Sequence, residues 1–219
     1  MKIKVLYEDK DILAIEKPSG ILVHPDKVSK GGTILDLFLK KYPKIEIVHR
    51  LDKETSGVML LAKNKKAHEF LKSQFANREV KKTYVAIVSG SVKLDRGVIN
   101  KPIGRSPKDF RRYSAGRGAR GEMREAITQY KVLKRFEAPS KFTYLEIYPK
   151  TGRTHQIRVH MKYLNHPVVC DSLYNPDNPC PKGIKRMALH AKSIEFKDLK
   201  GKTIKVESPI PKEFIKVVT

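Results

Sequence analysis

Residues 45–62 read IEIVHRLDKETSGVMLLA, and the two apolar stretches in this segment decide the local fold. Ile45–Val48 and Val58–Ala62 are both typical of buried strands. The segment between them, His49–Gly57, is polar and predicts a loop held between two core strands. A loop on a rigid scaffold is a common place for reactive side chains, and Asp52 is the candidate here.

Asp52 lies between two cations, Arg50 and Lys53. A carboxylate in such a position can act as a nucleophile, a general base or a metal ligand. A metal site needs several oxygen ligands, and Glu54 alone gives it little support in a cationic stretch. Asp52 can also have a structural role, in which it caps a turn or pairs with Arg50. The residues alone leave these alternatives open.

The charge of the chain is strongly positive. Its 219 residues include 46 Lys or Arg and 23 Asp or Glu, which gives a formal net charge of +23. An excess of this size predicts a polyanionic partner, with nucleic acid ahead of an anionic membrane. No apolar run approaches the roughly 20 residues of a membrane-spanning helix, and no signal-peptide pattern is present at the N-terminus. We therefore expect a cytoplasmic protein that binds nucleic acid and no membrane.

The chain has two cysteines, Cys170 and Cys180. This usage fits a reduced compartment, although a disulfide between the two stays open. Neither cysteine belongs to a CxxC pair, so we expect no zinc site.

Strand patterns outnumber helix patterns along the chain. We expect strands at residues 12–16, 45–48, 58–62, 84–88, 126–133, 142–148, 188–196 and 203–207, and helices after Thr33, Asn64 and Thr154 and from Pro211. Strands and helices do not alternate regularly. The pattern therefore predicts an α+β fold with a mixed, largely antiparallel central sheet and flanking helices.

Residues 101–124 concentrate positive charge. The cations are Lys101, Arg105, Lys108, Arg111, Arg112, Arg117, Arg120 and Arg124. Glycines accompany them and apolar residues are few, which predicts a flexible basic loop inserted into the domain. The loop is either solvated or, as we expect, in contact with RNA.

A second polar patch spans Lys150–His160. His155 and Arg158 are three residues apart, so they are expected on one face of a helix. This face can line a cleft or bind phosphates, or it can be a solvated basic face. The chain has neither a glycine-rich phosphate loop nor a Gly-x-Ser-x-Gly nucleophile elbow.

Several of these segments together resemble the RluA family of pseudouridine synthases. They occur in the family's order: Lys17–Pro25, His49–Gly57 followed by Leu61–Lys63, Lys82–Ala86, Pro102–Arg105, Thr151–His160, His166–Pro167 and Leu189–Ala191. Each motif alone is moderately specific, whereas the ordered set covers nearly the whole chain. The resemblance implies the pseudouridine synthase fold, with a catalytic cleft in one catalytic domain over residues 1–219. The motifs begin near residue 12, so we expect no separate N-terminal RNA-binding domain.

The resemblance also implies roles for individual residues. Asp52 corresponds to the family's nucleophile, which attacks either C1′ of the ribose or C6 of the base. Tyr84 corresponds to the tyrosine that stacks on the base, and its hydroxyl is a candidate proton acceptor. Arg158 corresponds to the arginine that pairs with the nucleophile and keeps its carboxylate ionised. The reaction is an isomerisation, so no cofactor and no metal are expected.

The expected partner is ribosomal or transfer RNA, with large-subunit ribosomal RNA preferred and the protein a monomer. Flipping a uridine out of structured RNA costs a few kcal/mol, which phosphate contacts must offset. Candidate RNA-binding residues are His49, Arg50, Thr55, Lys101, Arg105, Arg111, Arg112, Arg153 and His155. Arg50 is placed to contact a phosphate or to fill the space that the flipped base leaves.

Two other functions compete with this reading. A non-catalytic RNA-binding or ribosome-assembly protein on the same fold would have the charge but would not need Asp52, Tyr84 and Arg158. A metal-dependent nuclease would cleave RNA and would lose its activity with a chelator.

Overall fold

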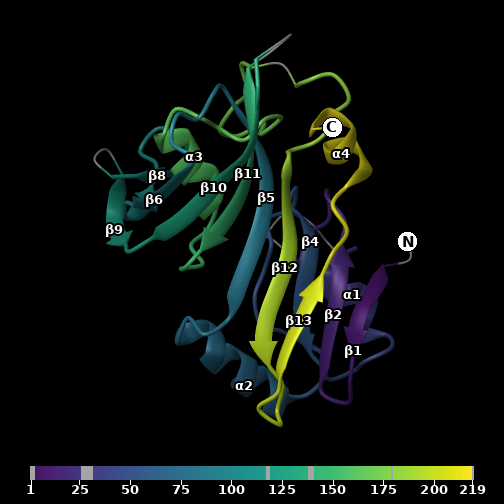
Figure 1. The fold of residues 1–219 in the computed structure, drawn as a ribbon. Helices are drawn as coiled ribbons and strands as arrows, with labels where there is room; N and C mark the ends of the chain where they lie inside the picture. Colours follow the sequence, from purple (N-terminus) through teal and green to yellow (C-terminus); the bar gives the residue numbers. More distant parts are fainter. Residues whose placement is uncertain (1–2, 26–31, 117–118, 138–140, 179, 219) are drawn as a thin grey trace. The chain divides into compact units, whose positions relative to one another are not determined.

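The structure, a computed structural model, describes residues 3–25, 32–116, 119–137, 141–178 and 180–218. The chain divides into two compact units (Figure 1). The first unit comprises residues 1–82 and 191–209, and the second unit comprises residues 83–190 and 210–219.

The first unit is built on strands in the order β1-β2-β4-β12, with β3 paired to β4 and β13 paired to β12. Their bounds are β1 Lys4–Glu8, β2 Ile12–Lys17, β3 Glu46–Ile47, β4 Ser56–Ala62, β12 Leu189–Lys197 and β13 Thr203–Glu207. The pairs β1–β2, β2–β4 and β12–β13 are antiparallel. Every residue of β4 is buried, which confirms the strand predicted at Val58–Ala62. The segment Ile45–Val48 is less regular than predicted, because only Glu46 and Ile47 form a strand and both are half-buried.

Two helices of the first unit begin at predicted caps. Before α1 (Ile34–Leu39), the side chain of Thr33 accepts a hydrogen bond from the backbone of Asp36, whose carboxylate accepts one from Thr33 in return. Before α2 (Lys65–Ala76), the side chain of Asn64 accepts a hydrogen bond from the backbone of Ala67. These contacts satisfy backbone donors that a helix start leaves unpaired.

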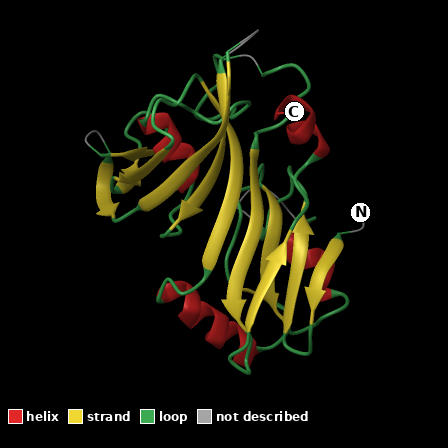
Figure 2. Cartoon of the chain, viewed as in Figure 1, coloured by secondary structure: helices red, strands yellow, loops and turns green. Residues whose placement is uncertain are grey.

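The second unit contains strands in the order β5-β11-β10-β6. Their bounds are β5 Lys81–Ser89, β6 Arg96–Asn100, β10 Ile127–Phe136 and β11 Phe142–Pro149, and the helices of this unit are α3 Gln156–Tyr163 and α4 Lys212–Val218. The neighbouring strands are antiparallel. Buried residues of β5, β11 and α3 form one core cluster, to which α4 adds the fully buried Phe214. The α+β prediction with a largely antiparallel sheet is thus confirmed (Figure 2).

The basic segment 101–124 is not the flexible loop that its composition predicts. It forms a three-stranded antiparallel sheet in the order β8-β7-β9, with bounds β7 Ile103–Arg105, β8 Tyr113–Ala115 and β9 Arg120–Arg124. Ile103 is only 3% exposed and joins a small core with Ala126, Val159 and Tyr174. Strand pairing uses the backbone, so Ile103, together with the half-buried Tyr113 and Ala115, orders a segment that has few apolar residues. Arg117, which was counted among the cations of this segment, lies outside the described residues.

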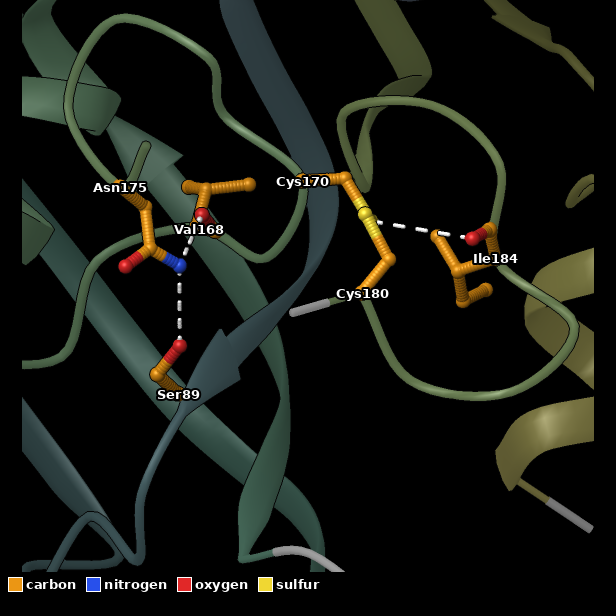
Figure 3. Close-up of a disulfide and its surroundings, with 6 residues drawn as sticks. All are labelled: Ser89, Val168, Cys170, Asn175, Cys180 and Ile184. Carbon is orange, nitrogen blue, oxygen red and sulfur yellow. Dashed lines mark hydrogen bonds between the residues drawn. A yellow bond between two sulfur atoms is a disulfide. The ribbon is translucent and has the colours of Figure 1, made fainter. Parts of the chain in front are cut away.

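Cys170 and Cys180 form a disulfide, with Cα atoms 5.1 Å apart (Figure 3). The expectation of reduced cysteines therefore does not fit the structure. Cys170 has a left-handed backbone conformation, with φ at 58°, which turns the chain into the loop that Cys180 closes. Within this loop, the side-chain amide of Asn175 donates to the Ser89 hydroxyl and to the Val168 carbonyl.

None of the described helices is long and apolar enough to cross a membrane.

Candidate active site

The loop that carries Asp52 joins β3 to β4 and is held by its backbone. The Asp52 carbonyl accepts a hydrogen bond from the Thr55 amide at 3.1 Å, which closes a turn. The neighbouring carbonyl of Lys53 accepts one from the Gly20 amide at 2.9 Å. The Ser19 hydroxyl donates to the carbonyl of Glu54 at 2.7 Å. The segment after β2 therefore holds the two residues that directly follow the half-buried Asp52.

Lys17 is the centre of this arrangement. Its side chain is fully buried, and its ammonium group donates to the carbonyls of Pro18, Ile21 and Lys53, each at 2.9 Å. Burying a charge is costly unless its hydrogen bonds are satisfied, and three carbonyl dipoles meet that need here. Lys17 thus ties the end of β2 to the Asp52 loop.

His49 serves the loop itself. Its Nε2 accepts a hydrogen bond from the backbone of Leu60 at 2.9 Å, and its ring stacks on Phe75 with centroids 4.7 Å apart. Burial, with the nearby charge of Lys82, lowers the pKa of His49 to about 3. Burial also lowers the pKa of Lys82 to about 8. His49 is therefore neutral at pH 7 and its Nε2 is occupied.

The expectation that Thr55 contacts RNA does not fit its position, whereas the expectation for the half-buried His49 stays a prediction. Thr55 is only 2% exposed, so its hydroxyl has no access to a phosphate. The ring nitrogen of His49 that faces β4 is already used as an acceptor. Arg50 differs from both, because its side chain is exposed and its Nη1 lies 3.4 Å from Nε2 of His24.

Gly57 ends the loop where β4 begins to pair. Its φ is +116°, and a Cβ added there would lie 2.2 Å from the backbone oxygen of Ala191 on β12. Only glycine combines this conformation with so close an approach of two strands. The close approach of Gly57 to Ala191 therefore fixes the position where the Asp52 loop ends and β4 begins.

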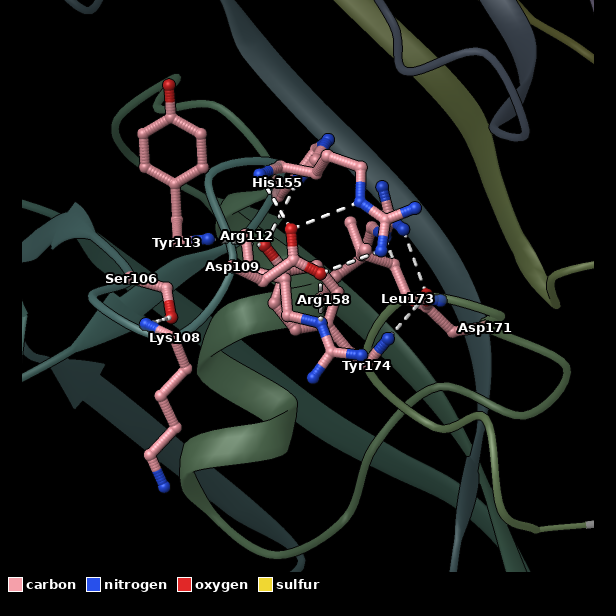
Figure 4. A network of polar contacts seen from close by, with 11 residues as sticks. Ser106, Lys108, Asp109, Arg112, Tyr113, His155, Arg158, Asp171, Leu173 and Tyr174 are labelled. Carbon is pink, nitrogen blue, oxygen red and sulfur yellow. Dashed lines mark hydrogen bonds and ion pairs between the residues drawn. The ribbon is translucent and has the colours of Figure 1, made fainter.

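Arg158 lies on α3 in the second unit and is almost fully buried. Its Nε and Nη2 atoms donate to the two carboxylate oxygens of Asp171 at 2.7 and 2.8 Å (Figure 4). The Asp171 carboxylate also accepts hydrogen bonds from the amides of Leu173 and Tyr174. The Tyr174 ring lies 5.0 Å from the guanidinium carbon of Arg158. The plane of the guanidinium group is thus fixed by a carboxylate that the sequence did not single out.

His155 does not share an exposed helix face with Arg158. It precedes α3 in a left-handed conformation with φ at 56°, and its Nδ1 lies 2.9 Å from the Tyr174 hydroxyl. The same hydroxyl accepts a hydrogen bond from the Tyr113 amide. The His155 ring packs edge-on against the rings of Tyr113 and Tyr174. His155 therefore joins β8, α3 and the Tyr174 loop.

Gln156 fixes the start of α3. Its side-chain oxygen accepts hydrogen bonds from the Thr151 hydroxyl and the Arg153 amide, and its side-chain nitrogen donates to Ile127 and Thr128. One buried amide thus uses both ends to attach the start of the helix to β10, which places Arg158 two residues further along α3.

Tyr84 lies on β5 in the second unit, half-buried and opposite Ile147 on β11. Asp52 belongs to the first unit, and Tyr84 and Arg158 belong to the second.

The remaining predicted RNA contacts all lie in the second unit. Lys101, Arg105 and Arg111 are exposed, and Arg112 and Arg153 are half-buried. Several already have internal contacts: Lys101 lies over the Tyr163 ring, Arg105 over the Tyr113 ring, Arg111 and Arg112 pair with Asp109, and Arg153 donates to the Glu125 carbonyl. Within the described part of the chain, no group of three or more His, Cys, Asp or Glu side chains could hold a metal ion.

Sequence reasoning missed Asp171, Tyr113 and Tyr174. Asp171 contacts Arg158 across 13 positions of sequence, and no motif or periodicity links the two residues. Tyr113 begins β8 and Tyr174 lies in the loop that follows α3, and only the folded chain brings the two residues together.

The chain is similar in sequence to a known family and to several known proteins. Residues 11–163 match the family model described as RNA pseudouridylate synthase. Over 235 residues the chain is 37% identical to the ribosomal large subunit pseudouridine synthase D of Xanthomonas campestris pv. campestris, covering 99% of this chain and 69% of that protein. It is 36% identical to an uncharacterised RNA pseudouridine synthase of Bacillus subtilis (strain 168), covering 100% of this chain and 72% of that protein.

A solved structure is also similar. Human RNA pseudouridylate synthase domain containing 1 matches with a TM-score of 0.80 and 28% sequence identity, over 95% of this chain and 83% of that chain. The match of the family model includes Asp52, Tyr84 and Arg158 and ends before Asp171.

Proposed function

The chain belongs to the RNA pseudouridylate synthase family, and on this premise we propose that it isomerises uridines of large-subunit ribosomal RNA with Asp52 as the nucleophile. The membership confirms the predicted RluA-type synthase, an isomerase of uridine in RNA.

The main support for Asp52 as the nucleophile is the set of hydrogen bonds that holds its loop in place. A nucleophile must be held close to its productive position, and the buried ammonium of Lys17 and the hydroxyl of Ser19 bind the carbonyls next to Asp52. A carboxylate that only capped a turn would not need such support.

The proposed reaction balances without a donor or a cofactor. The bond between N1 and C1′ of uridine breaks, the base turns, and a bond between C5 and C1′ forms, after which the proton on C5 moves to N1 by way of a base. Asp52 attacks either C1′ or C6 and is released at the end. Tyr84 stacks on the detached base. Its hydroxyl gives its proton to N1, and the resulting phenolate takes the C5 proton, which restores the hydroxyl.

Arg158 is the proposed partner of the Asp52 carboxylate. A guanidinium close to a carboxylate favours its ionised form, which is the nucleophilic one. The bidentate pair with Asp171 supports this role, because it holds the guanidinium in one orientation.

The choice of large-subunit ribosomal RNA is supported by the relatives named ribosomal large subunit pseudouridine synthase D. Transfer RNA is the next candidate substrate. The net charge of +23 suits either, and activity on RNA is consistent with a cytoplasmic, monomeric enzyme.

An assay of tritium release from RNA that contains 5-tritiated uridine tests the function. We expect release with the wild type, none with Asp52→Asn, and unchanged RNA binding by that variant. Glu69→Gln, which alters an exposed carboxylate on α2, is the control and should retain full activity. Full turnover by Asp52→Asn would remove Asp52 from its role.

The competing functions give other results in the same assay. A non-catalytic RNA-binding protein would bind RNA without release, and a nuclease would cleave it in a chelator-sensitive manner. Mapping pseudouridines across total RNA with and without the gene then names the substrate, because one or more positions should revert to uridine.

A further inference from the structure

Phe110 is the most exposed large hydrophobic side chain among the described residues, at 82%. It lies in the connection between β7 and β8, on the small basic sheet of the second unit. Single exposed hydrophobic residues are common and carry little meaning alone. Phe110 differs from such residues in two respects. The backbone next to it is held by hydrogen bonds, and most of its neighbours in sequence are cationic.

The connection that carries Phe110 is tied together on both sides of it. The Arg105 side chain donates to the Phe110 carbonyl at 3.1 Å. The Ser106 amide donates to the Arg112 carbonyl, and the Arg112 amide to the Asp109 carbonyl. The Asp109 carboxylate accepts from the Arg111 amide and guanidinium. The backbone is therefore fixed around an aromatic ring that stays in solvent.

Positive charge is concentrated in the sequence on both sides of Phe110. Arg105, Lys108, Arg111 and Arg112 lie within five residues of Phe110, and Figure 4 shows Lys108 extending away from the pair of Asp109 and Arg112. Asp109 is the one acid in the segment from Arg105 to Arg112. Its contacts with Arg111 lower its pKa to about 2, so it is ionised and offsets only part of this charge.

The occupant that fits an exposed ring among cations is an RNA base with its flanking phosphates. Aromatic side chains bind unpaired bases by stacking, and arginine and lysine bind the phosphates on either side. A second copy of this chain would bring further positive charge to the same place, and an anionic membrane would not need a planar ring.

We propose that Phe110 stacks on an unpaired base of the RNA substrate, while Lys108, Arg111 and Arg112 contact the neighbouring phosphates. This inference rests on the proposed function, because it adds an RNA contact to the residues that are proposed to take part in the reaction. The stack positions the RNA and takes no part in bond formation.

A fluorescence titration tests the contact without any turnover. The chain contains no tryptophan, so Phe110→Trp introduces a single one. We expect its emission to be quenched by an in vitro transcript of large-subunit ribosomal RNA. Leu94→Trp is the matched control, because Leu94 is 67% exposed in the same unit outside the basic sheet. No quenching at position 110, or equal quenching at both positions, would overturn the proposal.

Kinetics with substituted side chains separate stacking from simple apolar contact. Because stacking of one base contributes on the order of 1–3 kcal/mol, Phe110→Ala should raise KM by about tenfold and leave kcat nearly unchanged. Phe110→Tyr should restore KM and Phe110→Leu should not. An unchanged KM in Phe110→Ala, or full rescue by leucine, would contradict the stack. If the wild type forms no pseudouridine, the proposed function is refuted. The fluorescence titration would still show whether Phe110 contacts RNA.

Discussion

Arg158 and Asp171 form a buried, bidentate ion pair within the second unit. The two side chains are 7% and 0% exposed, and the carboxylate also accepts two backbone hydrogen bonds. Asp171 lies outside the residues matched by the family model, yet it fixes Arg158, which lies inside them. Orientation of the proposed catalytic arginine therefore depends on the loop that follows α3.

Asp171→Asn should destabilise the second unit. Removing one partner of a buried pair leaves the other charge uncompensated, which costs about 3–5 kcal/mol, and the amide recovers part of this by keeping one acceptor. Urea unfolding measures the change, and kcat should fall with it because Arg158 loses its fixed orientation. The control is Glu122→Gln, which removes a carboxylate that pairs with the exposed Arg124. Solvent screens that pair, so its loss should leave the unfolding curve nearly unchanged. Equal effects of the two substitutions would show that the buried pair does not stabilise the fold.

Gly57→Ala should destabilise the first unit much more than Gly20→Ala does. Both glycines have positive φ, but only at Gly57 would the added Cβ meet backbone, at 2.2 Å from Ala191. We expect a loss of about 1 kcal/mol at Gly20 from conformation alone, and about 3 kcal/mol or more at Gly57. Thermal and urea unfolding of the two variants check this order. Similar losses of stability in the two variants would mean that β12 can move away from residue 57 at little cost in free energy.

Lys17→Met should loosen the Asp52 loop. Methionine fills similar space but removes the ammonium donor from the carbonyls of Pro18 and Ile21, whereas the Lys53 carbonyl keeps its hydrogen bond from the Gly20 amide. Unsatisfied buried acceptors cost about 1–3 kcal/mol each, partly recovered because no charge is then buried. We expect a loss of stability of about 2–4 kcal/mol and a lower kcat.

The matched control for Lys17 is Lys66→Met, which removes an exposed lysine on α2. It should change neither the free energy of unfolding nor kcat. A stable Lys17→Met variant with normal kcat would show that the loop needs no support from β2.

Local signals explain what the sequence predicted well. Thr33 and Asn64 lie within three residues of the amides that they cap, and Val58–Ala62 is apolar because its strand is buried in full. Such features depend on neighbours in sequence, so pattern and composition reveal them.

Long-range contacts explain what the sequence did not predict. The basic sheet is ordered by Ile103 packing against Val159 and Tyr174, which are far along the chain. The burial of Thr55 and the pairing of Asp171 likewise depend on the folded arrangement. Asp52 stood out because its motif is contiguous in sequence, whereas the residues that hold it, such as Lys17, come from another strand.

His49 should make stability depend on pH below neutrality. Its pKa is about 3 in the folded protein and close to 6.5 in the unfolded chain, so the folded form keeps the ring neutral. Below pH 6.5 the unfolded chain binds a proton that folded His49 does not. The stabilisation is therefore complete above pH 6.5 and is lost progressively as the pH falls towards 3, by up to about 1.4 kcal/mol per pH unit.

Comparison of the wild type with His49→Gln isolates this contribution, because the glutamine oxygen can still accept from the Leu60 amide and does not titrate. Urea unfolding of both proteins at several values between pH 7.5 and pH 4 measures the difference, in which the other titrating groups cancel. The wild-type free energy of unfolding should fall more steeply than that of the variant below pH 6.5, and the two should run parallel above it. Parallel curves over the whole range would mean that His49 can be protonated in place, and its hydrogen bond to β4 would then not hold the Asp52 loop.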